Sequence, residues 1–167
     1  PELRVPAQTE INALTSFDTT FSAVQLFDVM TQNEYQRRID SGDFRPVSKK
    51  YSYSDRNVRV DVEFSDAPPV VLAPGKKYFV YFTVTNIGNG FIKSIEEGDF
   101  RLLDEGALYC PPFGPLEPNG KTFPRIACEI IVPDSLMKGK EFISTQLVVD
   151  FIYNYELRNS IRIDIIK

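Results

Sequence analysis

Apolar and charged residues alternate without a break from Val58 to Phe64, so this segment has a period of two. That period predicts a half-buried β-strand, because successive side chains of a strand point to opposite faces. A second long alternation runs from Tyr78 to Ile87 and ends in the Asn- and Gly-rich segment 86–90, which is suited to positive φ angles. Between the two strands, Pro74 and Gly75 stand where a type II turn requires them.

The rest of the C-terminal region continues this pattern, with turn residues between short apolar stretches. Further strands are predicted at 91–95, 100–103, 107–110, 124–132, 142–155 and 160–166. The side chains predicted to face inward in the last three strands are Ile126, Cys128, Ile130, Val132, Leu147, Val149, Phe151, Tyr153, Ile161, Ile163 and Ile165. Short strands at this spacing predict a mainly β fold, an antiparallel immunoglobulin-like β-sandwich over residues 58–167.

Residues 1–57 alternate less regularly and are predicted to form an N-terminal extension or arm. Thr31 and Glu34 have the spacing of a capping box, and Gly42 can end a helix, so a short helix is predicted near 32–41. The apolar segment 17–27 fits either a helix or a buried strand, and its periodicity does not decide between them. The leader from Leu3 to Ile11 is interpreted as an extended arm.

Composition narrows the possible functions. The chain has 167 residues, enough for about one hydrophobic core, and no histidine, which removes the commonest general base and zinc ligand. The 19 Lys and Arg residues and 23 Asp and Glu residues are spread evenly, so no basic field exists to attract nucleic acid. No segment is apolar enough to cross a membrane. The chain begins with Pro1 rather than Met, which indicates a processed or trimmed sequence.

Two cysteines, Cys110 and Cys128, flank a segment rich in Pro and Gly. Such a segment can fold back and bring the flanking strands together, which is the geometry that a disulfide needs. The alternative is a pair of buried free thiols. A disulfide predicts an extracellular or cell-surface location, because the cytosol is reducing.

One segment resembles a known family of domains. The sequence Leu72-Ala73-Pro74-Gly75-Lys76-Lys77-Tyr78, followed by Phe82-Thr83-Val84-Thr85-Asn86-Ile87-Gly88-Asn89-Gly90, is similar to a pattern of CARDB-like and related immunoglobulin-like domains. These domains occur on bacterial and archaeal surface proteins, and the similarity covers roughly residues 64–92. The resemblance implies a secreted module that acts in adhesion, as a spacer, or as a filament or envelope subunit, without catalysis.

Few residues are candidates for catalysis or metal binding. Carboxylates cluster at Asp61, Glu63 and Asp66, and again at Asp104 and Glu105. The first of these clusters alternates with apolar residues, which favours the solvent face of a strand.

The acidic segment 96–99 could place several oxygen ligands around a calcium ion, but it lacks the spacing of a regular calcium-binding loop. A hydrolase with paired carboxylates is a weaker alternative. No nucleophile, phosphate-loop or dinucleotide motif is present, so we predict no catalytic residue, no metal site and no cofactor.

The leading hypothesis is therefore a non-catalytic extracellular structural or protein-interaction module, such as a subunit of a surface filament or envelope assembly. Its expected partners are proteins, including other copies of the chain. Leu3, Val5 and Ile11 are candidate anchors of an arm that pairs with a neighbour's sheet edge. Phe79 and Tyr81 share one face of a strand and are candidate partner-binding residues; an exposed aromatic row also fits a carbohydrate-binding module, which is the alternative function.

Overall fold

The chain forms two β-sheets that pack as a sandwich, as seen in a computed structural model that describes residues 7–95, 99–102, 107–111 and 115–165. The first sheet, sheet A, has the strand order β4 (Val70–Leu72), β1 (Ala7–Thr31), β10 (Phe142–Ile165) and β6 (Phe91–Ile95), and β7 (Asp99–Leu102) also pairs with β10. The second, sheet B, has the order β2 (Lys50–Ser54), β3 (Val58–Phe64), β5 (Tyr78–Asn86), β9 (Ile126–Ile131) and β8 (Ala107–Tyr109). The fold is mainly β, as the alternating pattern predicts.

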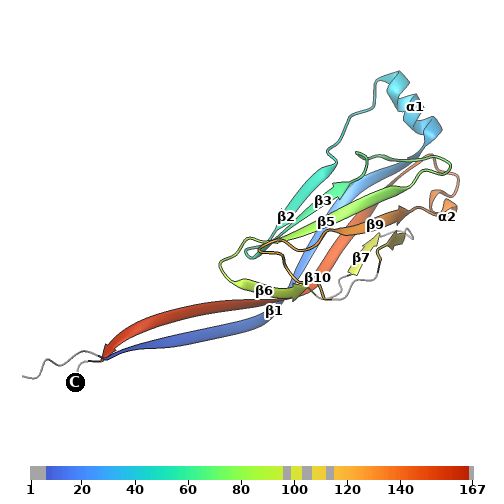
Figure 1. Ribbon diagram of the computed structural model, residues 1–167. Helices are drawn as coiled ribbons and strands as arrows, with labels where there is room; N and C mark the ends of the chain where they lie inside the picture. The colour runs from blue at the N-terminus through green and yellow to red at the C-terminus, as the bar shows by residue number, and fades with distance from the viewer. Residues whose placement is uncertain (1–6, 96–98, 103–106, 112–114, 166–167) are drawn as a thin grey trace, which may run out of the picture.

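The longest elements are the first and last strands, and they are neighbours. β1 has 25 residues and β10 has 24, and they pair antiparallel from Ala7 opposite Ile165 to Met30 opposite Phe142 without a shift in register. Figure 1 shows the two strands side by side along the whole molecule, in blue and red. Residues 7–31 are thus part of sheet A and β2 is part of sheet B, so the described part of 1–57 belongs to the sandwich and is not the separate extension expected from the sequence.

The core lies between the inner faces of the two sheets. The inward residues of β3 and β5 alternate with half-buried or exposed neighbours, so the period of two in the sequence corresponds to a real inner and outer face. Sheet A contributes the opposite side of the core. Its fully buried members include Phe21, Val29, Leu147, Val149, Phe151, Tyr153 and Tyr155.

One helix is joined to the end of β1. α1 (Gln32–Ser41) begins at Thr31, whose side chain accepts a hydrogen bond from the Glu34 N–H at 3.3 Å, and it ends at Gly42 with φ of 76°. The Glu34 carboxylate is held by the Nε atoms of Arg37 at 2.7 Å and Arg38 at 2.6 Å. These hydrogen bonds lower the pKa of Glu34 to about 2. The helix predicted near 32–41 is confirmed. A second, very short helix, α2 (Asp134–Met137), follows β9.

Several local predictions are also confirmed. β3 and β6 have the predicted bounds, and the predicted turn forms with Gly75 at φ of 74° and a hydrogen bond from the Lys76 N–H to the Ala73 carbonyl at 3.2 Å. The segment 17–27, left open between helix and strand, is strand.

Two predictions near the C-terminus are wrong. The strands expected at 142–155 and 160–166 are one continuous strand, β10. Ile161 and Ile163, expected in the core, are 60% and 42% exposed, because among the described residues no strand of sheet B lies over this end of β10 (Figure 1). The pattern identified the apolar face of the strand correctly, but nothing in the described chain covers that face.

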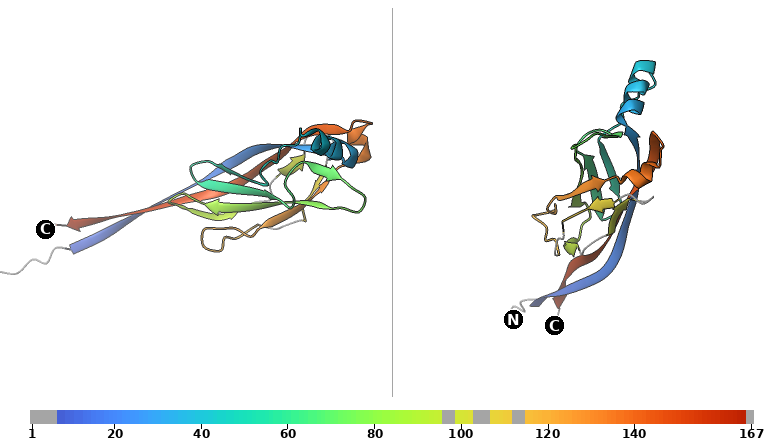
Figure 2. Two further views of the ribbon diagram at one scale, coloured as in Figure 1. Left: turned by 90° about the horizontal axis from the view of Figure 1, so that it is seen from above. Right: turned by 90° about the vertical axis from the view of Figure 1, so that its right-hand side faces the viewer.

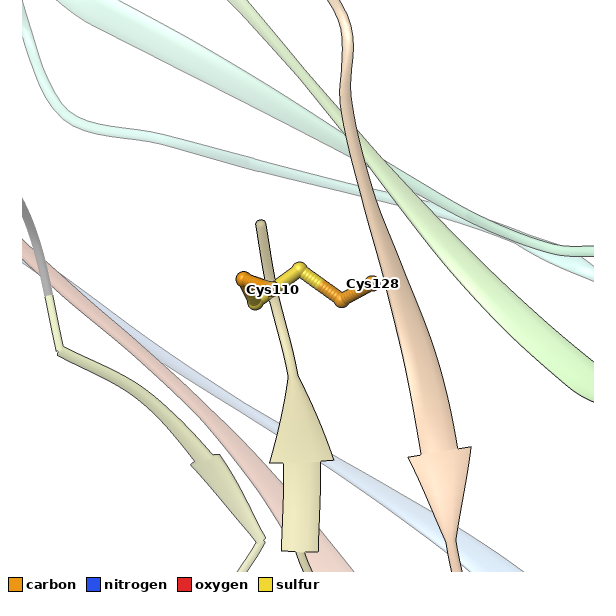
Figure 3. The surroundings of a disulfide bond; sticks show 2 residues. All are labelled: Cys110 and Cys128. Carbon is orange, nitrogen blue, oxygen red and sulfur yellow. A yellow bond between two sulfur atoms is a disulfide. The ribbon is translucent and has the colours of Figure 1, made fainter. Parts of the chain in front are cut away.

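The predicted disulfide is present. Cys110, which follows β8, is bonded to Cys128 on β9, and Figure 3 shows the bond joining the two neighbouring segments. A disulfide indicates a location outside the reducing cytoplasm. No helix among the described residues is long and apolar enough to span a membrane.

Candidate interaction surface

β1 and β10 continue together beyond the sandwich as a two-stranded ribbon. We call this part the stalk: residues 7–16 of β1 and 156–165 of β10, paired from Ala7 opposite Ile165 to Ser16 opposite Glu156. Figures 1 and 2 show it leaving one end of the sandwich, and the pair of Ala7 and Ile165 lies at its tip. At about 3.4 Å per residue, the stalk is roughly 31 Å long.

One face of the stalk is apolar and uncovered. Odd-numbered residues of β1 and β10 lie opposite one another, so this face continues the inner face of sheet A. The largest exposed side chains along it are Ile11 (54%), Leu157 (42%), Ile161 (60%) and Ile163 (42%), with Phe17 (40%) at its base. None of the odd-numbered residues of the stalk carries a charge, and Thr9, Thr15 and Asn159 are the polar ones among them. These side chains expose on the order of 400 Å² of apolar surface, which is comparable to the largest apolar patch of a typical soluble protein, and such patches are often functional.

The opposite face of the stalk is polar apart from Leu14, which is 63% exposed. It carries the even-numbered residues, and Glu10 lies opposite Arg162 in the register. Opposite charges at directly paired positions are favourable in a sheet. The stalk is therefore an amphipathic ribbon. Because an isolated two-stranded ribbon is only marginally stable in water, its apolar face gains stability when another surface covers it.

The base of the stalk is fixed by the Asn- and Gly-rich segment after β5. The Tyr155 side chain is buried, and its hydroxyl accepts a hydrogen bond from the Gly90 N–H at 2.6 Å. The Asn86 side chain donates to the Gly90 carbonyl at 2.9 Å and accepts from the Gly88 N–H at 3.1 Å. A Cβ atom at Gly90 would overlap the Glu156 carbonyl oxygen. Gly90 is needed for this close approach, and the positive φ expected from the sequence occurs at neither Gly88 nor Gly90.

A buried carboxylate reinforces the same junction. The Glu156 side chain is 1% exposed, and its oxygens lie 2.7 Å from Lys93 Nζ on β6 and 2.7 Å from Arg158 Nε on the stalk. The hydrogen bonds from Lys93 and Arg158 lower the pKa of Glu156 below its ordinary value of 4.5. The Arg158 guanidinium also lies over the Phe91 ring, 5.3 Å from its centre. These contacts tie the stalk to β6.

The predicted aromatic pair lies elsewhere, on the outer face of sheet B. Phe79 and Tyr81 are half-buried, with ring centres 6.5 Å apart and ring planes at 23°. The Arg125 guanidinium covers the Tyr81 ring at 3.9 Å and also contacts Glu63 at 3.1 Å. One face of the Tyr81 ring is thus covered by Arg125.

The remaining predicted residues are placed as follows. Ile11 lies on the apolar face of the stalk, opposite Ile161. Leu3 and Val5 lie outside the described residues, as do Glu96, Glu97, Gly98, Asp104 and Glu105. Within the described residues, no group of three or more His, Cys, Asp and Glu side chains could hold a metal ion.

The sequence interpretation missed half of the stalk surface. Leu157 was not singled out, and Ile161 and Ile163 were assigned to the core. The sequence does contain a signal for this surface. The odd-numbered residues carry no charge in segment 7–17, and the same is true of segment 155–165. Two segments with the same alternation at opposite ends of a chain can form one amphipathic ribbon.

Comparison of the chain with protein families, with curated proteins and with solved structures found no match.

We expect Gly90→Ala to destabilise the protein by about 1–3 kcal/mol, because the new methyl group would overlap the Glu156 carbonyl and the Tyr155 ring. Asn89→Ala is the matched control, since Asn89 is the exposed neighbour and its change is expected to stay within about 0.5 kcal/mol. Chemical denaturation measures both. Equal stability of the two variants would contradict the close approach at Gly90.

Glu156→Gln is expected to lower the free energy of unfolding in a pH-dependent way. The pKa of Glu156 is lowered in the folded state, so its ionised form stabilises the fold above pH 4.5, and this stability is lost as pH falls through the folded-state pKa. The difference in unfolding free energy between wild type and variant should therefore be large at pH 7 and shrink below pH 4.5. Denaturation curves across pH measure it, with the exposed Glu10→Gln as control. A difference that is constant with pH would exclude the ion-pair account.

Proposed function

We propose that this chain is a non-catalytic, extracellular structural or protein-interaction module, such as a subunit of a surface filament or envelope assembly. Its sandwich forms the body, and its stalk joins the body to protein partners. An immunoglobulin-like sandwich of the CARDB-like kind is the proposed classification of the body. The disulfide between Cys110 and Cys128 supports the extracellular setting.

The observation that carries this proposal is the uncovered apolar face of the stalk. Ile11, Ile161 and Ile163 are each more than two-fifths exposed although they continue the inner face of a sandwich. Large contiguous apolar patches on soluble proteins usually mark interaction sites. The base of the stalk is fixed to the sandwich, and the stalk extends beyond the sandwich, so a partner can reach this surface.

A non-catalytic role is supported by the charged residues. The chain has no histidine. Each carboxylate with a clearly lowered pKa is held by Lys or Arg: Glu34 by Arg37 and Arg38, Glu63 by Lys50, and Glu156 by Lys93 and Arg158. Such ion pairs keep carboxylates ionised and fixed, whereas a general acid needs a raised pKa.

The carbohydrate-binding alternative has less support. Sugar rings stack on exposed aromatic faces, and Phe79 and Tyr81 are the candidates. Arg125 already lies over Tyr81 at 3.9 Å, and both rings are half-buried. The stalk offers the larger uncovered apolar surface.

Position-specific photo-cross-linking in the cells that make this protein tests the proposal. A photoreactive phenylalanine analogue replaces Ile11 on the apolar face, and in the matched control it replaces the exposed Lys121 on the sandwich. We expect a protein adduct from position 11 and none from position 121. Absence of any protein adduct at position 11 would overturn the proposed function.

A pair of charge variants locates the contact. Ile161→Asp places a charge beside residue 11 on the apolar face and should lower the adduct yield roughly tenfold, because burying an unpaired charge is costly. Ser160→Asp adds the same charge to the opposite face and should leave the yield unchanged. Equal loss in both variants would argue against binding through the apolar face.

A further inference from the structure

The outer edge of β1 is open for most of its length. β4 pairs with β1 only at Val29–Thr31, and among the described residues no strand pairs with this edge between Ala7 and Asp28. Edge strands in soluble proteins are usually short or protected by Lys, Pro or bulges. β1 contains no Lys, Arg, Pro or Gly, and its register with β10 has no bulge. The other edge strands are short, from three residues in β4 and β8 to five in β2.

We propose that β1 of a second copy of this chain pairs antiparallel along this open edge, about a two-fold axis at Phe17. The proposal goes beyond the function proposed above, because it concerns the open edge of β1, and the pairing itself leaves the apolar face of the stalk uncovered. Main-chain hydrogen bonds along the edge would supply affinity, as in other cases of strand addition.

The backbone groups of β1 fix how two copies can pair. The Thr31 N–H donates to the Glu141 carbonyl beside β10 at 2.9 Å, so odd-numbered residues direct their backbone groups to β10 and even-numbered residues direct theirs outward. In agreement, the outward Leu26 carbonyl accepts from the Gln25 side-chain amide. Outward residues must pair with outward residues, so even pairs with even. Both apolar faces then lie on the same side of the joined sheet.

Charge selects the position of the axis. The carboxylates on this edge are Glu10, Asp18 and Asp28, all at even positions. An axis at Asp18 would place that residue directly opposite its own copy, and directly opposed like charges are destabilising. An axis at Phe17 pairs Asp18 with Ser16 and Glu10 with Val24, so no two carboxylates face each other, while nearly the full edge is paired.

The length of the edge favours a second copy over other occupants. From Ala7 to Asp28 it spans roughly 70 Å, and with a sheet depth of about 10 Å the pair would bury about 1,400 Å² in total. That area falls in the range of specific, stable interfaces. The free edge of β10 is shorter, because β6 and β7 occupy it up to Glu156. A second β1 matches the open edge in length.

Analytical ultracentrifugation of the purified chain and two variants tests the interface. We expect a dimer of twice the 19.0 kDa chain mass. Asn12→Pro removes an outward N–H without removing a hydrogen bond to β10, so it should weaken the dimer roughly tenfold or more and leave the fold intact by circular dichroism. Asn12→Ala keeps the N–H and should dimerise as wild type does.

Cross-linking tests the axis. Phe17→Cys provides the only free thiol, because the two native cysteines are bonded to each other. Its two copies would lie about 4.5 Å apart between Cα atoms, within reach of a disulfide. Mild oxidation should therefore give a covalent dimer, whereas Thr20→Cys, six residues from its own copy in the paired strand, should give none.

Two results would overturn the inference. One is a wild-type chain that stays monomeric up to about 100 µM. The other is a dimer that Asn12→Pro leaves unchanged or that Thr20→Cys cross-links as readily as Phe17→Cys. A monomeric chain whose position 11 still forms adducts with another protein in cells would overturn the second copy as partner while leaving the proposed function standing.

Discussion

The pairing of β1 with β10 is the interaction on which the other features depend. It joins the two ends of the chain over 24 consecutive residue pairs. Inside the sandwich, the pair forms the centre of sheet A and carries Phe21, Phe151 and Tyr153 into the core. Beyond the sandwich, the same hydrogen-bonded register forms the stalk. One constraint thus produces both the body and the surface proposed to bind partners.

Where the sandwich ends is decided by the segments that pack against β10. Tyr155 is the last buried aromatic residue of the strand, and Gly90 lies close enough to it to donate a hydrogen bond. From Leu157 to Ile163 the same alternation of side chains continues without cover from the rest of the described chain. The Asn- and Gly-rich segment that resembled a surface-domain motif therefore has a specific structural role here, because it closes the sandwich at the base of the stalk.

Local features could be predicted from the sequence because local interactions determine them. The helix follows from its caps at Thr31 and Gly42, the turn from Pro74 and Gly75, and the faces of β3 and β5 from strict alternation. The stalk could not be predicted in this way. Alternation identifies an apolar face, but it does not show whether another sheet covers that face, which explains the wrong placement of Ile161 and Ile163. The pairing of Ala7 with Ile165 is a contact between the two ends of the chain, and no local pattern contains it.

The β1–β10 register should continue unchanged to the tip of the stalk, and nuclear magnetic resonance can measure whether it does. Asn12 and Ser160 form a pair without mutual hydrogen bonds in this register, so their Hα atoms should lie close enough for a strong cross-peak. We expect that cross-peak, together with strand-like chemical shifts for both residues. Random-coil shifts, or a cross-peak from Asn12 to a different residue of β10, would contradict it.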